Sequence, residues 1–150
     1  MYDAIRSVIA EAVPFAKYVG VQLLEVGDGV AKARLEQRPE LSNHIGTMHA
    51  GALFALAETA SGAAVAGMFK DVIGSLRPVA AEATISYLKL TRGMASCAAA
   101  TAEPAETLRG RLEAERKAVF DVSVEIFRED GQTVAKMSVR WHVRFAAAGD

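Results

Sequence analysis

The chain of 150 residues contains one cysteine, Cys97, and few aromatic side chains. A single cysteine excludes an internal disulfide framework and a zinc site made of cysteines, and it favours a reducing compartment. Aromatic residues account for 7% of the chain, whereas hydrophobic residues of all kinds account for 51%. The apolar residues are therefore mostly alanines and aliphatics, which allow helices and strands to pack closely.

The chain also lacks an excess of charge of either sign. Its 17 Lys and Arg residues and 18 Asp and Glu residues leave a net charge of -1, so we expect neither nucleic acid nor an anionic membrane as a partner. The first residues contain no long apolar run, and the most hydrophobic stretch, 52–69, includes Glu58, Thr59 and Ser61. We therefore expect no signal peptide, no membrane span and a cytoplasmic protein.

One domain is predicted over residues 1–150. Apolar residues at helical spacing predict a helix over 2–13, ending before Pro14, and strands are predicted over 19–26 and 30–38 around the turn Gly27-Asp28-Gly29. An alanine-rich stretch without alternation predicts one long helix over 48–69, with Thr47 as its N-cap. Further strands are predicted over 78–90, 94–102, 118–126 and 135–145, and 109–117 is expected to be a charged connection.

This order of elements predicts an α+β fold. The last two strands alternate apolar and polar residues, so one face of the antiparallel sheet needs an apolar partner. The long helix is that partner, because its many Ala and Gly residues let the strands curve closely around it. The predicted architecture is the hotdog fold, a curved antiparallel sheet wrapped around one long central helix.

Glu58 is the only formally charged side chain between Ile45 and Phe69. Burying an unpaired carboxylate is expensive unless the group is hydrogen-bonded, protonated or next to a water-filled cleft. Glu58 is therefore predicted to be the carboxylate of a functional site. The alternative is that it points outward or caps the backbone of a strand.

The loop before the long helix, Asn43 to Gly51, is a candidate site for negative charge. Free N–H groups of a first helical turn attract anions, and Gly46 and Gly51 permit close approach of the backbone. We predict that the amides of His49, Ala50 and Gly51 form an oxyanion hole and that Asn43 orients a carbonyl or a water. An ordinary capped helix start is the alternative.

Helix geometry separates these groups within one chain. A rise of ~1.5 Å per residue places Ala50 and Glu58 roughly 12 Å apart along the helix, too far for both to contact one carbonyl. If both act on the same carbonyl, Glu58 must come from a second subunit whose helix runs antiparallel to the first. We therefore predict a homodimer with two equal sites, and a dimer of dimers, a homotetramer, stays open.

The segment Asn43-His44-Ile45-Gly46-Thr47-Met48-His49-Ala50-Gly51, followed by Ala57-Glu58, resembles the PaaI-like hotdog acyl-CoA thioesterases. The family pattern is Asn-x-x-Gly-x-x-His-Gly-Gly with an acid seven residues after the second glycine, a spacing that Gly51 and Glu58 reproduce. The resemblance implies hydrolysis of an acyl-CoA thioester, with Asn43 near the thioester, the Ala50 amide on its oxygen and Glu58 as general base or nucleophile. Ala50 replaces the usual glycine, and Glu58 replaces the commoner aspartate, which leaves base and nucleophile both open.

Other residues are expected to contact the substrate, and coenzyme A would enter as part of that substrate, with no cofactor. The expected substrate-binding residues in the loop, the helix and the following strand are His44, Gly46, Thr47, Met48, Phe54, Ser61 and Ser86. Cations for the CoA phosphates are expected among Arg77, Lys89, Arg92, Arg109, Arg111 and Arg116. The acyl pocket is expected to be lined by the N-terminal helix and by Met48, Phe54, Met68 and Phe69.

Two alternative functions stay open at the level of sequence. A hotdog enoyl-CoA hydratase or dehydratase would pair His44 with Glu58, and a non-catalytic protein would only bind acyl-CoA. The three histidines are scattered and form no metal-binding pair, so no metal is expected. His142 is expected on the solvent face of the last strand.

Overall fold

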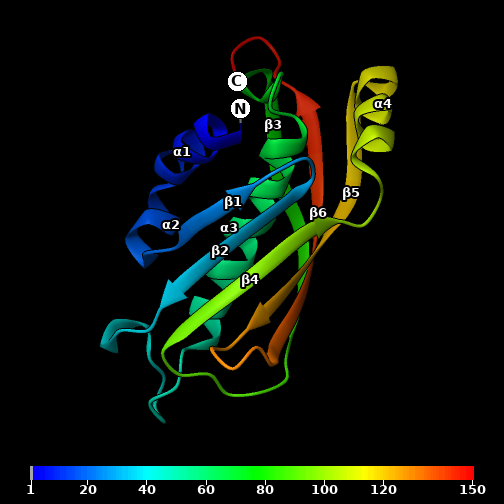
Figure 1. Ribbon diagram of the computed structural model, residues 1–150. Coiled ribbons are helices and arrows are strands. Elements are labelled where there is room, and N and C mark those ends of the chain that lie inside the picture. Colours follow the sequence, from blue (N-terminus) through cyan, green and yellow to red (C-terminus); the bar gives the residue numbers. More distant parts are fainter. Residues whose placement is uncertain (1) are drawn as a thin grey trace.

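The computed structural model describes residues 2–150, which form one curved six-stranded sheet around a central helix (Figure 1). In chain order the elements are α1 (Tyr2–Ala12), α2 (Pro14–Val19), β1 (Gln22–Val26), β2 (Val30–Glu36), η1 (Pro39–Leu41), α3 (Ala50–Met68), η2 (Ile73–Ser75), β3 (Leu76–Tyr87), β4 (Met94–Thr101), α4 (Ala105–Glu115), β5 (Lys117–Phe127) and β6 (Thr133–Phe145). All pairings are antiparallel, in the order β1-β2-β4-β5-β6-β3. The predicted α+β architecture is confirmed.

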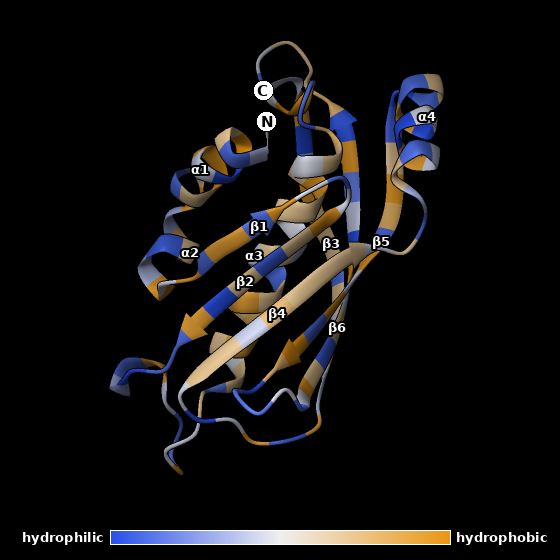
Figure 2. Ribbon diagram, viewed as in Figure 1, coloured by the Kyte–Doolittle hydropathy of each residue, from blue (hydrophilic) through white to orange (hydrophobic). Residues whose placement is uncertain are grey.

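The central helix α3 is the core of the domain. Thirteen of its 19 residues are buried, and Figure 2 shows it in hydrophobic colours along most of its length. By length and composition it would suffice to cross a membrane, but 72% of its most apolar stretch is buried inside the domain. Its hydrophobicity is therefore explained by packing against the sheet.

The sheet presents one apolar face to α3. In β2 the residues Ala31, Ala33 and Leu35 are buried and their neighbours are exposed, and β5 and β6 show the same alternation. Because successive side chains of a strand point to opposite faces, this pattern gives an inner face on the helix and an outer face in solvent. The alternation predicted for the last hairpin is confirmed.

Small residues on α3 allow the closest contacts. A Cβ atom added at Gly67 would lie 2.1 Å from the carbonyl oxygen of Gly27, in the turn between β1 and β2. The turn itself needs the positive φ of Gly29, +75°. The helix and this hairpin therefore touch backbone to backbone.

The N-terminal region differs from the prediction. Residues 14–19 were expected to be loop and the start of a strand, but they form helix α2, and β1 begins only at Gln22. Pro14 ends α1 and then occupies the first turn of α2. An N–H group at this position would have no acceptor within the helix, so proline costs α2 no hydrogen bond. Gly20, with a φ of +97°, ends α2 in the left-handed conformation.

Two other expectations were wrong. The connection at 109–117 is mostly helix, because α4 spans Ala105–Glu115 and packs on β5 through the buried Leu108 and Leu112 (Figure 1). The N-cap of α3 is His49, not Thr47, so the helix begins at Ala50 and not at Met48. Thr47 is instead buried within the preceding loop.

Strand β3 forms one edge of the sheet. It pairs with β6 alone, and its other edge has no strand beside it among residues 2–150. The strand is 12 residues long, and Val79 and Tyr87 on it are 59% and 47% exposed. An unpaired edge of this length is a surface that a further strand can join.

We predict that Gly67→Ala destabilises the protein, because the added methyl group would overlap the Gly27 carbonyl. Overpacking of this kind costs about 1–3 kcal/mol, measured as the free energy of unfolding in urea. Gly110→Ala is the matched control, since Gly110 lies within α4 with open space around it. The control is expected to be neutral or to stabilise, and equal destabilisation by both variants would contradict the packing described above.

Candidate active site

Glu58 lies half-buried in the middle of α3, on the one stripe of the helix that residues 2–150 leave uncovered. Gly51, Phe54 and Glu58 share this stripe, and all three are exposed or half-buried. Among residues 2–150 no hydrogen bond or ion pair reaches the Glu58 carboxylate. Burial raises the pKa of this carboxyl group above its usual value, because desolvation disfavours the charged form. The alternative of a strand cap is thereby excluded.

The loop before α3 is held by the side chain of Asn43. Its Oδ1 accepts hydrogen bonds from the N–H groups of Ile45 and Thr47 at 3.1 and 3.0 Å. Its Nδ2 donates to the Thr47 hydroxyl at 2.6 Å, which explains the burial of Thr47. Gly46 completes the turn with a φ of +78°. Asn43 thus fixes the loop and keeps one amide hydrogen for another acceptor.

Two of the three amides predicted to form an oxyanion hole already have acceptors. The His49 N–H donates to the Leu41 carbonyl at 2.8 Å, and the Gly51 N–H donates to Nδ1 of His49 at 2.8 Å. The Ala50 N–H has no acceptor within the described part of the chain. The helix start therefore offers one free donor, at Ala50, beside the exposed side chain of His49.

Tyr87 is a residue of this region that the sequence did not single out. It ends β3 on the inner face of the sheet, opposite Ala135, and its hydroxyl donates to the Ala50 carbonyl at 3.0 Å. The contact joins the edge strand to the first residue of α3. The sequence could have indicated that Tyr87 faces inward, because alternate residues of a strand share a face and Tyr87 follows Ala83 and Ile85 at a spacing of two.

A cavity of about 320 Å³ opens beside Glu58, between α1, α3 and the sheet. It is lined from α1 and its end by Ile9, Ala12 and Val13, from α3 by Glu58, Thr59, Gly62, Ala63 and Ala66, and otherwise by Ile73, Pro78 and Trp141. It extends from Glu58 toward the C-terminal end of α3, away from Ala50. The expected contribution of the N-terminal helix agrees with this lining.

Several expected substrate contacts lie elsewhere. Ser61 is fully buried, and its hydroxyl donates to the Glu58 carbonyl at 2.7 Å and accepts from Nε1 of Trp141 at 3.2 Å. Met48, Met68 and Phe69 are buried in the core and do not line the cavity. Ser86 faces outward from the sheet, because its neighbours Ile85 and Tyr87 face inward. These residues therefore have structural roles or face away from Glu58, whereas His44, Gly46 and Phe54 are exposed.

Most of the cations considered for phosphate binding are engaged away from the loop. Arg109 pairs with Asp28, Arg111 with Glu103, and the Arg116 guanidinium lies 3.7 Å from the ring centre of Phe145. Arg92 is the exception, since its Nη2 lies 3.4 Å from the Ile45 carbonyl in the Asn43 loop. Lys89 is exposed and close to Arg92 in the sequence, but its amino group donates to the side-chain oxygen of Gln132.

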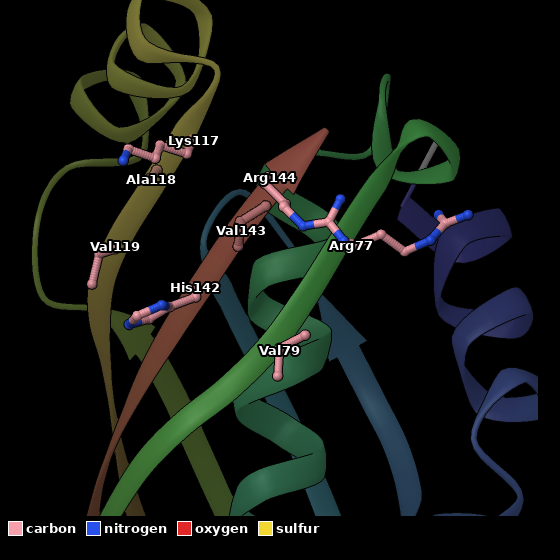
Figure 3. Close-up of a pocket in the computed structure, with 8 residues that line it drawn as sticks. All are labelled: Arg77, Val79, Lys117, Ala118, Val119, His142, Val143 and Arg144. Carbon is pink, nitrogen blue, oxygen red and sulfur yellow. The ribbon is translucent and has the colours of Figure 1, made fainter. Parts of the chain in front are cut away.

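A second hollow, of about 220 Å³, lies on the outer face of the sheet, where Arg77, Arg144 and Lys117 stand in one row across β3, β6 and β5 (Figure 3). The guanidinium of Arg77 extends toward α1, and the amino group of Lys117 points to the opposite side. Arg144 is paired with Asp150 at 2.7 Å. The charges do not converge on one point, and His142 next to them is exposed as predicted.

Comparison with known proteins places this chain in a family. Residues 3–143 match the family model described as Domain of unknown function (DUF4442). The chain belongs to the DUF4442 family. A search of the curated proteins finds no match for it.

Solved structures with the same fold include three informative relatives of this DUF4442 protein. A Pseudomonas aeruginosa protein described as a probable thioesterase is 25% identical, with a TM-score of 0.82 over 97% of each chain. The E. coli PaaI protein of the phenylacetic acid degradation operon is 20% identical, with a TM-score of 0.76 over 97% of this chain and 94% of PaaI. A Streptococcus pneumoniae protein described as a hypothetical thioesterase and solved with coenzyme A is 20% identical, with a TM-score of 0.67 over 86% of this chain and 89% of that protein. The hotdog fold and the resemblance to PaaI-like thioesterases are confirmed.

We predict that Glu58→Gln raises the melting temperature of this DUF4442 protein at pH 7. The folded-state pKa of Glu58 is raised, so its contribution to stability is favourable below the usual glutamate value of about 4.3 and is lost as pH rises through the raised value. The neutral glutamine avoids this loss. Differential scanning calorimetry should therefore show a gain of a few degrees at pH 7 that shrinks toward pH 4.

Glu113→Gln is the control for this prediction, because Glu113 is exposed on α4 and undergoes the same change of charge. It should leave the melting temperature nearly unchanged at both pH values. A melting temperature of Glu58→Gln below that of the wild type at pH 7 would show that the ionised carboxylate is stabilising.

Proposed function

We propose that the protein is an acyl-CoA thioesterase that works as a homodimer, with Glu58 as its catalytic carboxylate. The observation that carries the proposal is a half-buried carboxylate that has no partner among residues 2–150. It lies on the same exposed stripe of α3 as the helix start, where the Ala50 amide has no acceptor among these residues. Desolvated carboxylates of this kind are typical of catalytic sites. The Pseudomonas relative described as a probable thioesterase and the Streptococcus protein described as a hypothetical thioesterase, which holds coenzyme A, support the same reaction class.

The dimer rests on two surfaces that one chain leaves incomplete. The first is the α3 stripe formed by Gly51, Phe54 and Glu58, and the second is the edge of β3 that has no strand beside it among residues 2–150. Antiparallel pairing of β3 with its copy about a twofold axis would continue the sheet and set the two α3 helices antiparallel. The Ala50 amide of one subunit would then face Glu58 of the other.

The chemistry follows from this arrangement. The Ala50 N–H donates to the thioester carbonyl oxygen and stabilises the negative charge that develops there. The Glu58 carboxylate takes a proton from water as the water oxygen attacks the carbonyl carbon. The tetrahedral intermediate then breaks its C–S bond, and the CoA thiolate leaves and takes up the proton that Glu58 had accepted. In the alternative course the Glu58 carboxylate attacks the carbonyl carbon itself and the CoA thiolate leaves. Water then hydrolyses the resulting mixed anhydride to the free acid and the Glu58 carboxylate, and the released proton goes to the thiolate. Both courses need Glu58 ionised.

Asn43 and Arg92 have supporting roles in the proposal. Asn43 holds the loop that presents the Ala50 amide, and its remaining amide hydrogen is available to the thioester or to the attacking water. Arg92, next to the same loop, is the cation best placed for a CoA phosphate. CoA would thus lie over the subunit that supplies the oxyanion donor.

The test is thiol release from a panel of acyl-CoAs by the wild type, Glu58→Gln and the control Glu113→Gln. Glu58→Gln should lower kcat by at least about a hundredfold, whereas Glu113→Gln should retain the wild-type rate. The acid limb of kcat/KM should lie above the usual glutamate pKa, because burial raises that of Glu58.

The same panel distinguishes the alternatives. Binding of acyl-CoA without thiol release, unchanged in Glu58→Gln, would replace the thioesterase by a non-catalytic binding protein. Loss of the double bond of an enoyl-CoA without thiol release would indicate a hydratase instead.

A further inference from the structure

The cavity beside Glu58 is lined mostly by apolar side chains, a property that the proposed hydrolysis itself does not require. Its walls are aliphatic side chains, small residues of α3 and the indole of Trp141. The polar groups along it are nearly all occupied: the Thr59 hydroxyl donates to the Ala55 carbonyl at 2.7 Å, and Nε1 of Trp141 donates to the buried Ser61. Within the described residues, the Glu58 carboxylate is the one side-chain polar group of the lining without a hydrogen-bond partner.

The position of the cavity connects it with one end of the substrate. It begins at Glu58 and runs along α3 away from the Ala50 end of the helix, under Ile9, Ala12 and Val13. In the proposed dimer a thioester carbonyl lies between Glu58 of one subunit and the Ala50 amide of the other. The acyl chain then enters the cavity of the subunit that supplies Glu58, while CoA lies over the loop of its partner.

We infer that this cavity is an acyl site for an uncharged hydrocarbon chain without hydroxyl or carboxyl groups, an inference that rests on the proposed function. Beyond Glu58, where the cavity begins, the two other polar side chains of the lining, Thr59 and Trp141, already donate within the chain, so a hydroxyl group deeper in the cavity would lose its hydrogen bonds to water and find no donor in return. The Glu58 carboxylate repels a second carboxylate. An apolar cavity of ~150 Å³ holds benzene, so about 320 Å³ suits a chain on the order of ten carbons. The subunit that supplies Glu58 thus binds the acyl chain, and its partner binds CoA.

Gly62 limits the width of the site. A Cβ atom added there would lie 3.4 and 3.5 Å from Cη2 and Cζ2 of Trp141, an ordinary contact that the fold tolerates. The further methyl groups of valine at this position would take up space between α3 and Trp141. Gly62→Val is therefore expected to restrict the chain length, and Gly110→Val places the same side chain in α4, away from the site.

The experiment compares kcat/KM for saturated acyl-CoAs of increasing length in the wild type, Gly62→Val and Gly110→Val. The wild type should prefer chains on the order of ten carbons. Gly62→Val should lose at least about tenfold more activity on the preferred chain than on acetyl-CoA, and Gly110→Val should follow the wild-type profile. Hydroxyaryl and ω-carboxyl acyl-CoAs should be at least about tenfold poorer substrates than hydrocarbon chains of similar size. An unchanged length profile in a folded Gly62→Val protein, or preference for the polar acyl groups, would overturn the inference.

A binding measurement separates this inference from the proposed function. S-alkyl-CoA thioethers of increasing length, which cannot be hydrolysed, are titrated by calorimetry into the same three proteins. If no acyl-CoA is hydrolysed but affinity rises with alkyl length in the wild type and not in Gly62→Val, the acyl site stands and the thioesterase proposal fails. If hydrolysis occurs while neither rate nor affinity depends on chain length, the acyl site fails and the thioesterase stands.

Discussion

The close packing of α3 against the inner face of the sheet is the constraint on which the rest of this structure depends. Alanine and glycine at most inward positions let β2, β4 and β5 approach the helix, and at Gly67 the contact is with backbone. A helix this close to a six-stranded sheet is covered on most sides but not on all. The uncovered stripe from Gly51 to Glu58 is where the helix can contact another molecule.

Glu58 lies on that stripe, and its surroundings disfavour the ionised form of its carboxyl group. No cation or hydrogen-bond donor among residues 2–150 compensates the carboxylate, and the cavity next to it is apolar. Removing such a charge generally favours the folded state, so a carboxylate kept at this position points to a use that stability does not explain. The proposed use is to move a proton, or to attack a carbonyl, at a site that is completed by a second subunit.

Much of the architecture was predictable because its signals are periodic. The alternation in 118–126 and 135–145 and the alanine-rich run 48–69 gave the last hairpin and the central helix, and with them the fold class. Short elements were missed, since Pro14 can end one helix and begin the next, and the charged stretch that forms α4 buries only two leucines, Leu108 and Leu112. A pattern of two buried residues in a polar helix is too weak to distinguish it from a loop.

The site was predictable in part. Glu58 could be singled out by its isolation in an apolar helix, and the Asn43 loop by its glycines and its place before that helix. The sequence did not show which amides already had acceptors, because the Gly51 N–H is taken by the His49 side chain and the His49 N–H by Leu41, a contact across the loop. Nor did it show Tyr87 or, apart from the N-terminal helix, the lining of the cavity, since these depend on how α1 and β3 meet α3.

The central claim is that each site combines Ala50 of one subunit with Glu58 of the other, and subunit mixing tests it most directly. Ala50→Pro removes only the N–H, because proline is tolerated at the first residue of a helix and His49, at φ -62° and ψ 142°, has the conformation preferred before proline. Ala50→Pro and Glu58→Gln should each be nearly inactive alone. A 1:1 mixture refolded together should recover about a quarter of the wild-type rate, because half of the dimers are hybrids with one intact site. A mixture no more active than its parents, with hybrid dimers present, would contradict the account.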